Sequence, residues 1–139
     1  MIEKLIGAWK IVSSFQEDVQ SKERFHLFGD HPNGYAVFTP TGRVSFILTA
    51  ESRKPPQTTD DQAAAYRTMV AYSGKFRIEN DKLITTVDAS WDEGRVGTEQ
   101  IRLFRIDGER LYIETANPVR DPNLTGKMLR GFLIWEKEK

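Results

Sequence analysis

Short stretches in which apolar and polar residues alternate recur along this chain, and such alternation is typical of half-buried β-strands. The clearest pair covers residues 35–38 and 43–48, on either side of Thr39-Pro40-Thr41-Gly42. A proline followed two residues later by a glycine suits a tight turn, so these segments predict a β-hairpin.

The same pattern predicts further strands over residues 8–15, 74–78, 82–91, 96–106, 110–115 and 127–136. These make about eight strands with short connections, a number typical of small all-β domains. Neither an internal repeat nor a low-complexity tract interrupts them. At 139 residues the chain is expected to form one domain, over residues 1–139.

The first and last strands each carry a tryptophan, Trp9 and Trp135. We expect these two strands to pair, because their pairing closes the sheet into a barrel and removes its exposed edges. Trp9 is then placed to fill one end of the barrel, and Gly7 allows another segment to approach closely. The predicted fold class is a small antiparallel up-and-down β-barrel, with an open sandwich as the alternative.

One short helix is predicted after Pro55-Pro56. Thr59 is placed to cap it, and Gln62, three residues on, completes a capping box. One face carries the apolar residues Ala63, Tyr66, Met69 and Val70. We therefore expect the segment over residues 59–72 to lie across one mouth of the barrel, as a lid.

Composition narrows the range of partners. Lys and Arg total 20 and Asp and Glu total 20, so the chain has no basic field for a nucleic acid or an anionic membrane. There is no cysteine, which fits a reducing compartment, and the first residues lack the long apolar core of a signal peptide. We expect a cytoplasmic protein with neither a nucleic-acid nor a membrane partner; a homodimer is compatible with the sequence.

Several motifs, in this order and spacing, are similar to the lipocalin-like domain family, a branch of the calycin-type barrels. They are Gly7-Ala8-Trp9-Lys10-Ile11-Val12-Ser13, residues 35–45, Ala71-Tyr72-Ser73-Gly74-Lys75-Phe76, residues 96–104, Asp107-Gly108-Glu109-Arg110-Leu111 and Leu133-Ile134-Trp135-Glu136. The resemblance implies a barrel with a cavity for small, mostly apolar molecules. It implies no established reaction, although some relatives are encoded near natural-product pathways, which leaves an enzyme open.

The hairpin over residues 96–115 admits two registers. A two-residue loop at Asp107-Gly108 would place Arg105 opposite Arg110, which is unfavourable. A three-residue loop pairs Arg102 with Glu114 instead, and we prefer it because opposite charges then face each other.

This register gives the hairpin two faces. One carries Glu99, Ile101, Leu103, Leu111 and Ile113, and the other carries Gln100, Arg102, Phe104, Tyr112 and Glu114. Ordinary burial favours the first face inside, where Asp88, set opposite Glu99, would share an apolar cup with it. Two such carboxylates cannot both ionise easily, so one pKa would rise, as a general acid or base requires. The alternative is that Asp88 and Glu99 are both surface acids.

If the second face points inward instead, Gln100, Arg102, Tyr112 and Glu114 line the cavity. A free nitrogen of Arg102 would then be available to bind a ligand carboxylate or carbonyl. The alternative is a surface salt bridge between Arg102 and Glu114. The sequence leaves the choice of face open.

Four aromatic residues, Tyr35, Phe46, Tyr72 and Trp91, are the best placed to line a pocket. His26, His31 and Asp30 do not match the spacing of a strong metal site, and no nucleotide-binding or serine-hydrolase motif occurs. We therefore predict neither a metal nor a cofactor.

The leading hypothesis is binding of a small, mostly apolar molecule with one polar end, which Glu99, Arg102 or Glu114 would orient. The second is a cofactor-independent cyclase, isomerase or hydratase on the same barrel, with Asp88 or Glu99 as proton shuttle. A third is an interaction module whose barrel is packed solid.

Overall fold

The computed structural model describes residues 2–120 and 126–139. In chain order its elements are α1 (Ile2–Leu5), β1 (Gly7–Asp18), β2 (Arg24–Phe25), β3 (Asn33–Phe38), β4 (Arg43–Thr49), α2 (Thr59–Arg67), β5 (Met69–Glu79), β6 (Lys82–Ser90), the 3₁₀ turn η1 (Glu93–Arg95), β7 (Glu99–Asp107), β8 (Arg110–Thr115), β9 (Val119–Arg120) and β10 (Met128–Lys137). The chain is therefore mostly β-strand, as the alternating pattern predicts.

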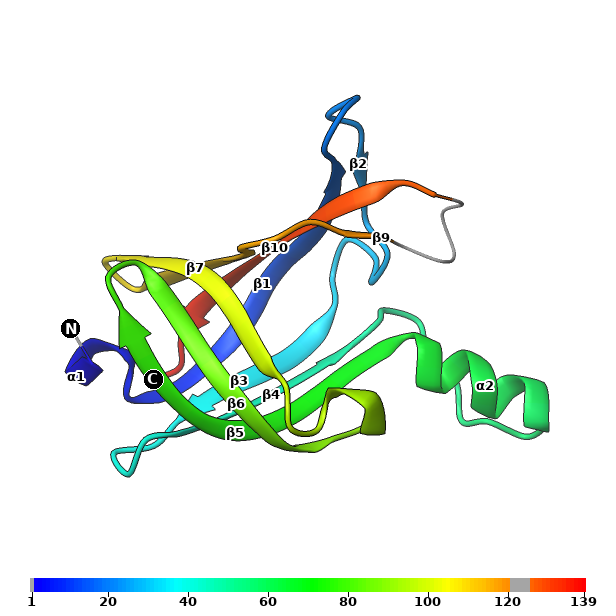
Figure 1. Cartoon of the computed structure of the whole chain (residues 1–139). Coiled ribbons are helices and arrows are strands. Elements are labelled where there is room, and N and C mark those ends of the chain that lie inside the picture. Colours follow the sequence, from blue (N-terminus) through cyan, green and yellow to red (C-terminus); the bar gives the residue numbers. More distant parts are fainter. Residues whose placement is uncertain (1, 121–125) are drawn as a thin grey trace.

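Eight antiparallel strands of the described chain close into a barrel in the order β1-β3-β4-β5-β6-β7-β8-β10 (Figure 1). The barrel closes where β1 pairs with β10, with Ile11 opposite Trp135 and Phe15 opposite Phe132. The short strands β2 and β9 extend the pairing beyond the barrel on β1 and β10. The predicted pairing of the first and last strands is confirmed.

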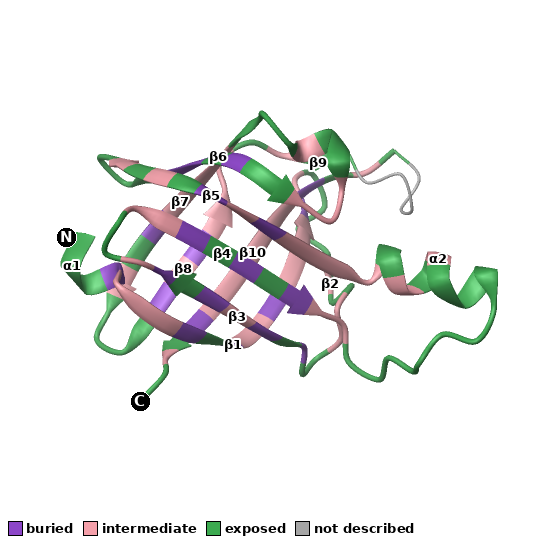
Figure 2. Ribbon diagram, turned by 90° about the horizontal axis from the view of Figure 1, so that it is seen from below, coloured by how far each residue is buried: buried purple, intermediate pink, exposed green. Residues whose placement is uncertain are grey.

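The β3–β4 hairpin shows why the sequence forms these strands. Ala36 and Phe38 on β3, with Val44 and Phe46 on β4, are buried inside the barrel, and the residues between them face outward. Gly42 closes the turn at φ +89°, a conformation that glycine adopts without strain. Figure 2 shows the same alternation of buried and exposed residues along the barrel strands.

One end of the barrel is closed by the start of the chain. Trp9 is buried, and its Nε1 donates a hydrogen bond of 2.9 Å to the carbonyl of Leu5 in α1. The ammonium of Lys137 lies 4.6 Å from the centre of the Trp9 ring, a cation–π contact. Gly7 leaves room for this lysine, because a Cβ there would lie 2.9 Å from Lys137 Nζ. The role predicted for Gly7 and Trp9 is confirmed.

The β7–β8 hairpin differs from the predicted register. Asp107 pairs with Arg110 around a two-residue loop, Gly108-Glu109, in which Gly108 has φ +61°. Opposite charges face each other at this turn, the same criterion that led us to the three-residue loop. Arg102 consequently pairs with Thr115 rather than with Glu114. Side chains that the predicted register placed on opposite faces of the hairpin therefore lie on the same face.

Helix α2 lies near the other end of the barrel, but it does not cover the mouth. It projects away from the strands in both views (Figures 1 and 2), and none of its described residues is buried. Its N-cap is Thr58 rather than Thr59, with the Thr58 hydroxyl accepting from the backbone N–H of Asp61. The helix offers mainly alanines and Tyr66 to a partner surface, which is too little apolar area to hold it across the mouth.

Candidate functional site

A cavity of about 210 Å³ lies inside the barrel, toward the end near α2. It is lined by the inner faces of six strands, with Ser14 and Gln16 from β1, Phe46 and Leu48 from β4, Val70 and Tyr72 from β5, Arg102 from β7, Ile113 and Thr115 from β8, and Gly131, Leu133 and Trp135 from β10. Phe28, Arg95, Glu114 and Phe132 complete the lining. A barrel packed solid, the third hypothesis, does not fit this structure.

Several aromatic rings line the cavity. Trp135 is fully buried and lies between the closed end and the cavity. The ring of Phe46 is 5.9 Å from that of Trp135 and 5.1 Å from that of Tyr72, measured between ring centres. These rings offer flat, apolar contact area of the kind that suits an aromatic ligand.

Two arginines are among the polar residues of the lining, which also include Ser14, Gln16, Glu114 and Thr115. Nη2 of Arg102 donates to Oε1 of Gln100 at 3.0 Å, and Nη1 of Arg95 donates to the same oxygen at 3.4 Å. The Arg95 guanidinium also lies over two rings, 4.7 Å from the centre of Trp91 and 5.9 Å from that of Tyr72. Arg95 comes from η1 and Arg102 from β7, so the β6–β7 connection and the barrel wall meet here.

Burial shifts the acidity of two groups at this site. It raises the pKa of the Tyr72 phenol, and the nearby Arg102 and Arg95 cations only partly offset this. It also lowers the pKa of Arg95, with the cation of Arg102 acting in the same direction. An arginine remains charged despite such a shift. At neutral pH this part of the cavity therefore holds two cations and a neutral phenol, while the acid of the lining, Glu114, lies against Arg130.

The predicted ligand-binding residues separate into three groups. Phe46, Tyr72 and Arg102 line the cavity. Glu114 lines both this cavity and an outer groove, and it lies 3.8 Å from Arg130. The outer groove is lined by residues that include Phe15, Leu103, Tyr112 and Phe132. The other predicted residues lie elsewhere.

Trp91 lies beside the cavity rather than in its lining, stacked on Arg95, with its Nε1 bonded to the carbonyl of Tyr66 at 3.2 Å. Tyr35 lies outside the barrel, where its hydroxyl accepts from Lys10 at 3.2 Å. Tyr112 lines the outer groove, 3.9 Å beneath Arg105.

The prediction that Asp88 and Glu99 share an apolar cup is wrong. Both are about half-exposed on the outer surface, where Arg43 binds Asp88 at 2.8 and 2.9 Å and Arg77 binds Glu99 at 2.8 Å. The hydrogen bonds from Arg43 lower the pKa of Asp88 rather than raising it.

The register explains this placement. On β6 and β7, Thr86 pairs with Glu99, so the acids lie on the outer face. The inward residues of β7 are those of the second face, Gln100, Arg102 and Phe104, whereas β8 turns Leu111 and Ile113 inward. Strand β7 therefore turns inward the residues of the second predicted face, and β8 turns inward those of the first.

The sequence did not lead us to select Arg95, which lies between the strands predicted over residues 82–91 and 96–106. The signal available was a cation four residues after Trp91, within reach of an aromatic face. The histidines considered for a metal pair with acids instead, His26 with Asp30 at 3.8 Å and His31 with Glu51 at 3.6 Å. Over the part of the chain that the structure describes, no three ligating side chains gather into a metal-holding group.

The barrel, the cavity at its α2 end and the aromatic and cationic residues in the lining define a β-barrel of the ligand-binding type. Residues 6–138 match the model of the lipocalin-like domain, and the chain belongs to this family. The chain is similar to the 4'-hydroxy-3'-methoxypropiophenone carrier protein ppsC of Aspergillus oryzae, with 33% identity over 88 residues that cover 58% of this chain and 77% of that protein. Within the described residues no helix is both long and apolar enough to cross a membrane.

Proposed function

We propose that this protein binds a small, mostly apolar molecule with one polar end in the cavity of its barrel, and serves as its carrier. The observation that carries the proposal is the cavity itself, whose lining combines aromatic rings with two arginine side chains. Ligand sites of proteins combine apolar walls with a few convergent polar groups in this way.

The size of the cavity narrows the class of ligand. A cavity of about 150 Å³ is enough for benzene, and this one measures about 210 Å³. It suits a single substituted aromatic ring, stacked against Phe46 and Trp135. The name of the Aspergillus oryzae relative denotes a carrier of an aryl ketone with one ring, which supports the same class for this chain.

The proposal stops at binding. The catalytic hypothesis required Asp88 and Glu99 to lie inside the cavity. Both carboxylates instead form ion pairs with arginines on the outer surface. The absence of cysteine supports a reducing compartment such as the cytoplasm as the place where the carrier works.

Titration calorimetry with 4'-hydroxy-3'-methoxypropiophenone as the probe tests the proposal. We expect the probe to bind, and we expect Leu48→Phe to weaken binding about tenfold or more, because the larger ring occupies the cavity. Ile47→Phe is the matched control, since Ile47 is the neighbouring residue and is 47% exposed. Equal weakening by the two variants, or none by Leu48→Phe, would place the probe outside the cavity and contradict the proposal.

The natural ligand can be sought by native mass spectrometry of protein purified gently from cells. A mass increment that disappears on denaturation gives the mass of a bound molecule. We expect an increment of the size of a one-ring compound. An increment of lipid size would contradict the ligand class, because it exceeds what the cavity holds.

A further inference from the structure

Among the described residues, four of the eleven arginines of this protein form an ion pair, and the two arginines of the cavity are not among them. Four outer-surface arginines pair with acids: Arg24 with Glu17, Arg43 with Asp88, Arg77 with Glu79 and Glu99, and Arg130 with Glu114. Among the described residues, no carboxylate forms an ion pair with Arg95 or Arg102. Asp92 acts on Arg95 only over a longer distance. Glu114, the carboxylate of the lining, lies 3.8 Å from Arg130 instead, so Arg95 and Arg102 have no acidic partner in ion-pair contact among the described residues.

A neutral acceptor holds these two cations near each other. Oε1 of Gln100 accepts from both guanidinium groups, and its Nε2 donates to the hydroxyl of Thr98 at 3.1 Å, which fixes the direction of the amide. The only other hydrogen bond of these guanidiniums to a described residue is from Nη1 of Arg102 to the carbonyl of Ile101, at 3.0 Å. Each arginine has five N–H donors in a fixed fork, so most of them remain available to a ligand.

The phenol of Tyr72 adds a third donor at the same place. It is 8% exposed and lines the cavity, and its hydroxyl makes no hydrogen bond to a described residue. Its ring lies beneath the Arg95 guanidinium. A neutral phenol beside two guanidiniums is a set of donors that shares one neutral acceptor, Gln100 Oε1, and an anion is the ligand that satisfies the remaining donors.

We propose that the ligand of this cavity is an aromatic molecule whose polar end is an anionic oxygen, a carboxylate or an ionised phenol, bound between Arg95 and Arg102 with Tyr72 donating to it. The inference rests on the proposed function of the cavity and names the chemistry of its polar end. An anion here relieves the repulsion between the two cations and gains charge-assisted hydrogen bonds in a partly buried site. The aromatic body of the ligand then faces Phe46 and Trp135.

Calorimetry with 4-methoxybenzoate and 4-methoxybenzamide tests this inference, because the two probes have the same shape and differ in charge. For the full chain at pH 7 and low salt, we expect the benzoate to bind about tenfold tighter or more. Arg95→Gln and Arg102→Gln are each expected to remove most of this preference. Arg105→Gln, on the same strand as Arg102 but stacked outside on Tyr112, is the matched control and should keep it.

The outcomes separate this inference from the proposed function. Equal affinity for the two probes, abolished by Leu48→Phe, would overturn the anion and leave cavity binding intact. Failure of both probes to bind would overturn the inference and the proposed function together. Arg95 lies in a surface connection, so its variant stays informative if Arg102→Gln does not fold.

The ionised phenol has its own optical test. Ionisation moves the near-ultraviolet absorption of a 4-hydroxyaryl ketone to longer wavelength. Bound 4'-hydroxy-3'-methoxypropiophenone is therefore expected to show the phenolate band at a pH where the free compound is neutral. A bound spectrum that stays that of the neutral phenol, together with equal affinity for benzoate and benzamide, would overturn the inference.

Discussion

The two ends of this barrel both combine aromatic rings with cationic side chains, but these cations have different partners. At the closed end, Trp9 donates to the Leu5 carbonyl, and Lys137 covers the Trp9 ring and donates to the carbonyl of Ile6. At the end near α2, the aromatic wall of Phe46 and Tyr72 meets Arg95 and Arg102, which share one neutral acceptor.

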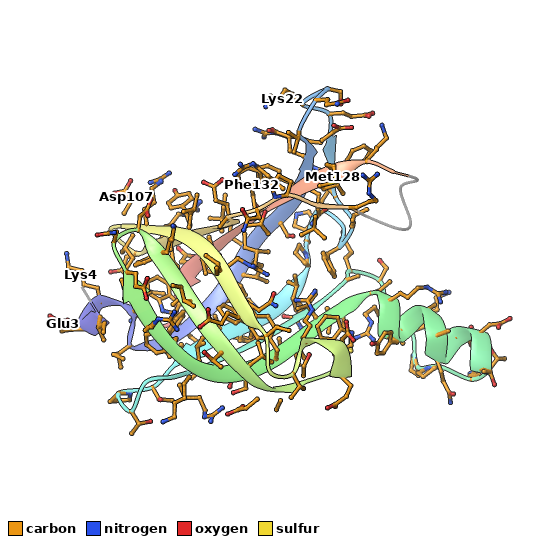
Figure 3. All side chains as sticks on the ribbon, viewed as in Figure 1. Glu3, Lys4, Lys22, Asp107, Met128 and Phe132 are labelled. Atoms are coloured by element: carbon orange, nitrogen blue, oxygen red, sulfur yellow. The ribbon has the colours of Figure 1, made fainter. Side chains whose placement is uncertain are left out.

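The difference lies in where the polar groups find partners. The cation of the closed end is satisfied by the chain itself, so this end contributes to stability. The cations of the α2 end have no acidic partner in ion-pair contact among the described residues. Figure 3 shows the two ends through labelled residues, with Glu3 and Lys4 of α1 near Asp107 at one end and Met128 toward the other. We therefore assign stability to one end and recognition to the other.

The largest effect is expected at the closed end. Trp9→Ala should lower the free energy of unfolding by about 3–5 kcal/mol, because it removes a buried ring that fills this end. Chemical denaturation measures it, and the affinity of the folded variant for 4-methoxybenzoate should stay within twofold. Trp9→Phe is the control that keeps a ring and loses the hydrogen bond to Leu5, at a cost of about 1 kcal/mol. A strong loss of affinity on Trp9→Ala, with the protein folded, would break the division between the ends.

A smaller effect is expected from Tyr72 at alkaline pH. Burial raises the pKa of this phenol in the folded state, so folding favours its neutral form. Its contribution to stability is complete below the ordinary tyrosine pKa of about 10 and is lost as the pH rises through the folded value. The free energy of unfolding of the wild type should therefore fall more steeply above about pH 10 than that of Tyr72→Phe. Parallel curves for the two proteins would show that Tyr72 is not buried in this way.

The smallest effect is expected on the outer surface. Asp88→Asn and Glu99→Gln each remove one ion pair outside the cavity. We expect both variants to keep the affinity for 4-methoxybenzoate within twofold, because neither side chain lines the cavity. A tenfold loss in either variant, measured by calorimetry, would reopen the carboxylate hypothesis.

The sequence was sufficient for the architecture because the barrel rests on local signals that agree with one another. The turn around Gly42, the alternation on both sides of it and the tryptophans of the terminal strands all predict the observed closure. Helix α1 was not predicted, because a single turn of four residues is too short for a periodic pattern. The predicted position of α2 was wrong because its small apolar face does not determine where the helix packs.

The site was harder to predict, because a shift of one residue in register moves every side chain of a strand to the other face. At the β7–β8 hairpin the rule of facing opposite charges was satisfied both by Arg102 with Glu114 and by Asp107 with Arg110. The structure has the second pair. The predicted candidate Arg102 lines the cavity, whereas Arg95 comes from an irregular connection that strand periodicity does not describe. The position of the Arg95 guanidinium depends on its contacts with Tyr72 and Gln100, and a local sequence pattern does not reveal such contacts.

The indole N–H groups of the tryptophans offer the most direct test of the division between the two ends. Nε1 of Trp9 is bonded to Leu5, whereas Nε1 of Trp135 is buried beside the cavity without a hydrogen-bond partner among the described residues. In a ¹H–¹⁵N NMR titration with 4-methoxybenzoate, we predict that the Trp135 signal shifts to saturation while the Trp9 signal stays in place. A Trp9 signal that moves as far as that of Trp135, or a Trp135 signal unmoved at saturating probe, would contradict the account.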